Sequence, residues 1–176
     1  MQLLLTRWPI FWHNNGVYML FEIGEKVIHC RDGLATITEK ISMNGKDFYL
    51  VSAHRGGSET IFVPVDRAEL IIRPIMKKEE AEKVIEYMNS IEFDFNRNTK
   101  QRRDLFKKKL SSGEINEIAY LYRQYYLYKK YPEEVKLGPA DIDMLEYATK
   151  NILDEFSLTY DLPIDKIQEF LNSKMK

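Results

Sequence analysis

The chain has 176 residues, of which 44% are hydrophobic, 30% charged and 12% aromatic. These fractions are typical of a folded globular protein and exclude a disordered or collagen-like chain. Its 26 basic and 27 acidic residues give a net charge of −1. The molecule as a whole therefore does not attract DNA or an anionic membrane, and any nucleic-acid surface must be local.

Residues 1–18 differ in character from the rest of the chain. They hold both tryptophans, but Arg7, Pro9 and His13 interrupt the apolar run, which is too short to span a membrane. A basic leader and a small-residue cleavage site, as in a signal peptide, are missing. Gly16-Val17 can be encoded as a ribosome-binding sequence just before the Met19 codon. We therefore expect no membrane segment and interpret residues 1–18 as a non-native or flexible extension.

Residues 19–75 have the pattern of a small β domain. Residues 34–41 alternate with period two, Asn44-Gly45 favours a tight hairpin turn, and residues 48–51 form the partner strand. Gly56-Gly57 marks a further turn. Four or five short strands joined by such turns predict a bent sheet or a small SH3/Tudor-like β-barrel.

His29 and Cys30 lie together in this segment, which raises the question of a nucleophile or metal site. No second histidine, cysteine or aspartate stands at a matching spacing, so a strand-end histidine beside a small packed cysteine is favoured. A lone cysteine also cannot form an internal disulfide, which indicates a reducing, cytoplasmic compartment. We expect no metal and no cofactor.

The strand over residues 59–65 is predicted to lie at a sheet edge. Pro64 has no N–H to donate, which suits an edge position. A domain of about 55 residues buries little surface, and an exposed edge is a ready template for another chain. We expect this edge to contact a partner.

Residues 76–176 read as an all-α bundle, so the fold class is α+β. Helices are predicted over residues 77–88, from Asn98 or Thr99 to the turn at 111–113, and over residues 114–131, and two more begin near Pro139 and Pro163. Six tyrosines lie within twelve residues of the third helix. They could stack on bases, but because they face different directions on a helix, packing within the bundle is favoured.

Charge is unevenly distributed in this half. Seven basic residues and one acidic residue lie between Asn96 and Lys109, whereas ten acidic and three basic residues lie between Glu133 and Leu171. Such a basic run is commonly a solvated helix face. It is also long enough to neutralise several phosphates of a duplex.

The order of these features resembles the CarD family of bacterial RNA polymerase-binding transcription regulators. The resemblance covers about residues 19 to 170 and rests on the following segments: Met19 to Ile28, Asn44-Gly45, Phe62-Val63-Pro64, Lys100-Gln101-Arg102, Leu110-Ser111-Ser112-Gly113-Glu114-Ile115 and Arg123.

The resemblance implies a Tudor-like domain whose edge strand pairs with the RNA polymerase β subunit, and a helical domain that contacts promoter DNA beside the melted region. The strand role falls on Thr60, Ile61, Phe62, Val63 and Pro64. The DNA role falls on Lys100, Gln101 and Arg102, to which the charge argument adds Arg103 and Lys107. The family's tryptophan wedge falls on Thr99, which cannot unstack bases as an indole does, and Asp141 and Asp143 are expected to weaken phosphate contact.

The favoured function is therefore a monomeric, non-enzymatic regulator of open-complex stability, with no small-molecule ligand. The alternative is an adaptor that binds RNA polymerase without touching DNA. The transcription-repair coupling factor shares the β domain, but 176 residues leave no room for its motor, and no phosphate-binding loop is present. An enzyme is disfavoured because no acid–base pair or nucleophile stands out.

Overall fold

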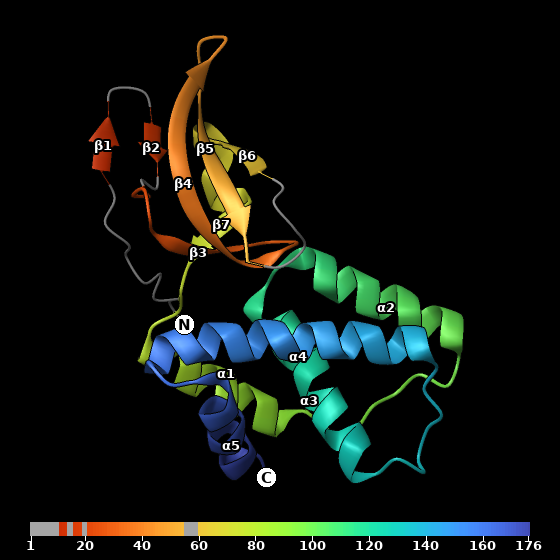
Figure 1. Cartoon of the computed structure of the whole chain (residues 1–176). Coiled ribbons are helices and arrows are strands. Elements are labelled where there is room, and N and C mark those ends of the chain that lie inside the picture. Colours follow the sequence, from red (N-terminus) through yellow and green to blue (C-terminus); the bar gives the residue numbers. More distant parts are fainter. Residues whose placement is uncertain (1–10, 14–15, 19–20, 55–59) are drawn as a thin grey trace, which may run out of the picture. The chain divides into compact units, whose positions relative to one another are not determined.

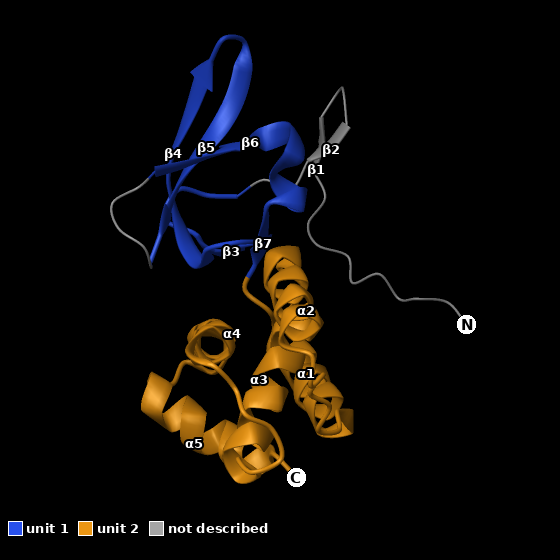
Figure 2. Ribbon diagram, turned by 90° about the vertical axis from the view of Figure 1, so that its right-hand side faces the viewer, with its two compact units in different colours: residues 1–74 blue, residues 75–176 orange. Residues whose placement is uncertain are grey.

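The computed structural model describes residues 11–13, 16–18, 21–54 and 60–176. The chain divides into two compact units, residues 1–74 and 75–176, each with its own hydrophobic core (Figure 2). Most of the predicted N-terminal extension and the predicted Gly56-Gly57 turn lie outside the described residues. Within the extension, β1 (Phe11–His13) and β2 (Gly16–Tyr18) pair antiparallel.

The first unit contains a five-stranded antiparallel sheet of order β6-β5-β4-β3-β7 (Figure 1). Of the two predicted forms, a bent sheet or a small barrel, the sheet does not close into a barrel, because β6 and β7 form its opposite edges. Instead of a closing strand, the 3-10 helix η1 (Val65–Leu70) connects these two edges and buries Ala68 against the core. The strands are β3 (Lys26–His29), β4 (Gly33–Met43), β5 (Lys46–Ala53), β6 (Thr60–Pro64) and β7 (Ile72–Pro74).

The predicted hairpin between β4 and β5 is confirmed. Asn44 and Gly45 both adopt positive φ, 54° and 74°, as a two-residue turn that follows the strand twist requires. An irregularity between Ile37 and Glu39 shifts the register of β4 against β5 by one residue, so that Lys40 pairs with Tyr49. The sheet's inner face then carries a row of fully buried side chains, which are Val27, Ala35, Ile37, Tyr49, Val51, Val63 and Ile72.

The second unit consists of five helices, which confirms the predicted all-α half. Asn98 caps α2 by accepting a hydrogen bond from the Gln101 backbone N–H at 3.1 Å, and Gly113 ends it with φ of 69°. Helix α3 contacts α1, α2 and α4. The helices are α1 (Lys78–Ser90), α2 (Thr99–Ser112), α3 (Ile115–Lys130), α4 (Pro139–Tyr160) and α5 (Ile164–Lys174).

The tyrosines of α3 are distributed around the helix as expected. Tyr122 and Tyr125 are buried, and Tyr131 after the helix end is 41% exposed. Tyr125 stacks on Tyr128 with 6.4 Å between ring centroids. These contacts make most of the cluster part of the bundle's packing. Over the described part of the chain, none of the helices has the length and apolar character needed to cross a membrane.

Candidate functional site

The edge strand β6 contains all five residues predicted to bind a protein partner. Among the described strands it pairs only with β5, so its other side is open. Val63, opposite Tyr49, is fully buried on the core side. Phe62, opposite Leu50, projects to the other face and is 51% exposed. An open backbone edge beside an exposed aromatic side chain can accept an additional strand.

The outer face of the sheet near this edge is apolar. Phe62 contacts Phe48 edge to face, with 6.4 Å between ring centroids. The register places Pro64 and Ile41 beside Phe48, one on each neighbouring strand. These side chains remain partly exposed. A strand added to β6 would therefore meet apolar side chains on its outer face, beyond the backbone hydrogen bonds.

His29 lies at the end of a strand, and the partly buried Cys30 directly follows it. His29 is the last residue of β3 and is buried, with its Nδ1 2.7 Å from the Asp32 carboxylate. Burial lowers the pKa of His29, although Asp32 opposes this shift. This confirms the strand-end interpretation. Within the ranges that the structure describes, no cluster of three or more histidine, cysteine or acidic side chains could hold a metal ion.

The second candidate surface lies on α2, from its first turn to Lys107. Thr99, Lys100 and Gln101 are exposed in its first turn. The Gln101 side chain is held by Asn96, whose amide donates to its oxygen at 2.9 Å. Lys100, Arg103 and Lys107, at i, i+3 and i+7, lie on one side of the helix. We call these three residues the basic face of α2.

Arg102 does not belong to this surface, because it is only 2% exposed. Its guanidinium donates to both carboxylate oxygens of Asp141, at 2.9 and 3.4 Å, and to the Asn96 carbonyl at 2.8 Å. The sequence-based assignment of Arg102 to phosphate contact is therefore not compatible with its burial. Its position one turn before the buried Phe106 was a sequence signal for an inward orientation.

Asp141 is fully buried and joins α4 to α2. It also accepts from the Arg103 Nε at 3.2 Å and from the Gly138 backbone N–H at 3.0 Å. Burial alone raises the pKa of Asp141, but hydrogen bonds from Arg102, Gly138 and Arg103 outweigh this and hold it below its ordinary value. Its charge is thus neutralised inside the unit, unlike that of Asp143, which is exposed.

The other basic side chains near α2 differ in availability. Arg103 is half-buried, and its side chain keeps 37% of its surface exposed despite the contact with Asp141. Lys107 is exposed. Lys109 forms an ion pair with Glu117 and lies 4.3 Å from the centroid of the Tyr120 ring. The positive charge open to solvent therefore lies on the basic face, on Arg97 before α2 and on Lys108 in its second half.

Comparison with known families matches both units. The model of the CarD C-terminal domain matches residues 83–172, which include α2 and the Arg102–Asp141 pair. The model of the CarD-like/TRCF RID domain matches residues 21–76, which include the edge strand β6.

Proposed function

Because this chain belongs to the CarD family, and its matched RID domain makes it an RNA polymerase-interacting protein of transcription, we propose that β6 pairs with a strand of the polymerase β subunit. In the same complex, α2 contacts promoter DNA and changes the stability of the open promoter complex. In this proposed role the chain acts as a regulator and catalyses no reaction. The observation that carries the proposal is the open edge of β6 with the exposed Phe62 inside the RID domain.

The basic face of α2 supports the DNA part of the proposal. Lys100 and Lys107 project into solvent, and Arg103 is held near them by the buried Asp141. Two solvent-exposed cations and one oriented guanidinium are groups of the kind that contact phosphates and so position a helix on a nucleic-acid backbone. Arg102 acts as a positioning residue, since it anchors α2 to α4 from the inside. A protein that binds distorted DNA better than closed duplex shifts the equilibrium toward the open complex.

Neutralising the basic face is expected to flatten the salt dependence of DNA binding. We propose the triple substitution Lys100→Gln, Arg103→Gln and Lys107→Gln, measured by fluorescence anisotropy on a forked promoter fragment across a salt series. Each lost phosphate contact lowers the slope of log affinity against log salt by about 0.7–0.9. The slope of the triple variant is therefore expected to be smaller by about 2 to 3.

The matched control removes three exposed lysines elsewhere in the helical unit, by Lys83→Gln, Lys150→Gln and Lys166→Gln. It has the same net charge as the triple variant, and its slope is expected to match that of the unmodified protein. An equal effect of both triples would contradict a localised DNA surface. Absence of DNA affinity at low salt would favour the adaptor function instead.

Placing an indole at position 99 tests the proposed wedge register. Thr99 is exposed as the first residue of α2, so Thr99→Trp is accommodated without disturbing the core. If this position faces the edge of the melted DNA, the ring stabilises an unstacked step. We expect the open-complex lifetime to increase roughly tenfold, which corresponds to about 1.4 kcal/mol. Thr99→Val is the control without a ring. An unchanged lifetime with Thr99→Trp would place the DNA edge elsewhere.

A further inference from the structure

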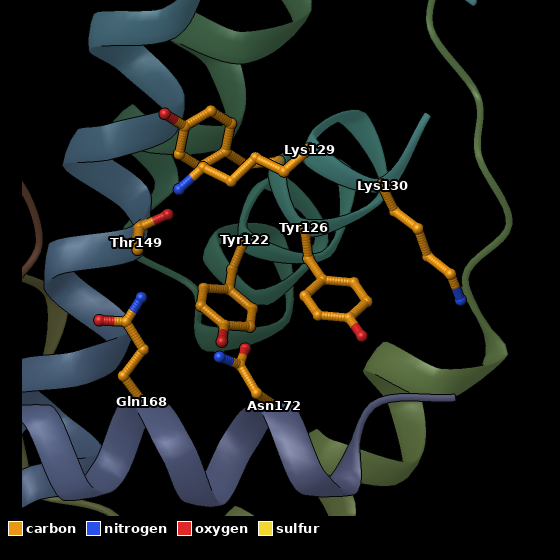
Figure 3. A pocket seen from close by; sticks show the side chains of 8 residues that line it. Tyr122, Tyr126, Lys129, Lys130, Thr149, Gln168 and Asn172 are labelled. Carbon is orange, nitrogen blue, oxygen red and sulfur yellow. The ribbon is translucent and has the colours of Figure 1, made fainter. Parts of the chain in front are cut away.

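A pocket of about 400 Å³ lies between α3, α4 and α5 in the helical unit, and none of its lining residues belongs to β6 or to the basic face of α2 (Figure 3). Its volume lies in the range of roughly 300–1,000 Å³ that small-molecule sites occupy. We call it the tyrosine pocket. It is lined by Tyr122, Tyr125, Tyr126, Lys129, Lys130, Thr149, Gln168 and Asn172.

The floor of the tyrosine pocket is aromatic. Tyr122 and Tyr125 are buried, and Tyr126 is partly exposed beside them. The Tyr125 hydroxyl donates a hydrogen bond to the Glu146 carboxylate at 2.9 Å. Burial raises the pKa of Tyr122 to about 12, so its hydroxyl is a neutral hydrogen-bond donor at neutral pH. A floor of this kind offers ring surface together with hydroxyl groups.

The rim of the pocket is polar and positively charged. The Lys129 ammonium lies 4.1 Å from the centroid of the Tyr125 ring, and Figure 3 shows it reaching toward Thr149. Gln168 projects from α5 toward the same region, and the Asn172 amide lies next to the tip of Tyr122. Lys130 points away from this group. Lys129 thus supplies the positive charge of the rim, and none of the eight lining residues is acidic, so the pocket favours an anionic ligand.

We propose that the tyrosine pocket binds a nucleotide, with the base against the tyrosines, its polar edge on the amides of Gln168 and Asn172, and its phosphate on Lys129. Aromatic side chains pack against any base, side-chain amides pair with base edges, and lysine is a common phosphate contact. This inference is independent of the edge strand β6 and of the basic face of α2. It also goes against the sequence-based expectation of no small-molecule ligand.

The same ligand chemistry has two possible sources, a free mononucleotide and an unstacked nucleotide in single-stranded DNA. The test is isothermal titration calorimetry of the full chain with AMP, adenosine, inorganic phosphate and a single-stranded deoxyadenylate hexamer. AMP is expected to bind more tightly than adenosine or phosphate, because it engages both the amides and Lys129. If AMP binds as tightly as the hexamer, one nucleotide is enough to fill the site, and the ligand is a free nucleotide. If only the hexamer binds, the ligand is an unstacked nucleotide within single-stranded DNA.

Three variants locate the binding to the pocket. Lys129→Gln is expected to lower the affinity for AMP, or for the hexamer if only that binds, by about tenfold or more, since a charge-assisted hydrogen bond is lost. Its affinity for adenosine should not change. Gln168→Leu, at an exposed position, is expected to weaken both AMP and adenosine. Lys83→Gln, on α1, is the control for charge and should bind like the unmodified protein.

The proposal is overturned by any of three results. The first is that neither AMP nor the hexamer binds at concentrations up to about 5 mM, which corresponds to a binding free energy of less than roughly 3 kcal/mol. The second is that inorganic phosphate binds as tightly as AMP, which would show an anion site without base recognition. The third is that Lys129→Gln leaves the affinity for AMP and the hexamer unchanged while circular dichroism shows that the variant is folded.

Discussion

Replacing Asp141 by asparagine is expected to lower the free energy of unfolding of the helical unit by about 3–5 kcal/mol. The substitution preserves the shape of the side chain but removes the carboxylate that forms an ion pair with the buried Arg102. The Arg102 guanidinium then remains 2% exposed with an uncompensated charge. Removing one member of a buried pair is far more damaging than removing both.

This prediction is measured by urea denaturation followed by circular dichroism. Asp143→Asn, two residues further along α4 and exposed, is the matched control and should change stability by less than about 0.5 kcal/mol. The double substitution Asp141→Asn with Arg102→Met removes both buried charges and is expected to recover much of the loss. Equal stability of Asp141→Asn and Asp143→Asn would mean that the pair does not anchor α2.

The pH dependence of the effect has a definite sign. The pKa of Asp141 is depressed in the folded state, so its contribution to stability is present above the unfolded-state pKa of about 3.9. It is lost as the pH falls through the lower, folded-state pKa. The difference in stability between the unmodified protein and Asp141→Asn should therefore be constant above about pH 5 and shrink below about pH 4.

Anchoring by Asp141 also matters for the proposed DNA surface. The same carboxylate orients Arg103 on the basic face and holds Arg102 inside. A buried side chain on α4 thus sets both the position of α2 and the direction of one of its surface cations. The sequence led us to expect that Asp141 weakens phosphate contact. In the structure its buried carboxylate instead holds Arg103 on the basic face of α2.

Features that depend on local chemistry were predictable from the sequence. Asn44-Gly45 specifies its hairpin because few residues accept positive φ at two successive positions. Asn98 and Gly113 delimit α2 for similarly local reasons. Pro64 indicated the edge position of its strand because it lacks a donor. Each signal requires only a few neighbouring residues.

Features that depend on distant contacts were not predictable. Arg102 and Asp141 are 39 residues apart, and charge counting treats both as surface groups. Whether the sheet closes is decided by where η1 carries the chain, which strand patterns alone do not specify. The tyrosine pocket needs three helices in place before its lysine and amides converge. Tertiary packing decides all three.

Replacing Phe62 by aspartate is expected to lower the affinity for RNA polymerase by at least about 30-fold, or roughly 2 kcal/mol. Phe62 is half exposed at the open edge and supported by Phe48, as an aromatic anchor at the centre of an added-strand interface would be. The aspartate removes this apolar contact and places an unpaired charge where a partner strand covers it. Because the side chain faces away from the core, the sheet itself should remain folded.

The control also replaces an exposed apolar side chain by aspartate, at another place in the same unit. Ile23 is 69% exposed in the turn before β3, outside the β6 edge, so Ile23→Asp should retain polymerase binding. Biolayer interferometry of the full chain against core polymerase and its isolated β-subunit lobe measures both variants. Selective loss with Phe62→Asp on both targets supports pairing at β6, because this edge joins an open backbone to an exposed aromatic ring. Equal affinities of the two variants would mean that polymerase binds another surface of the RID domain.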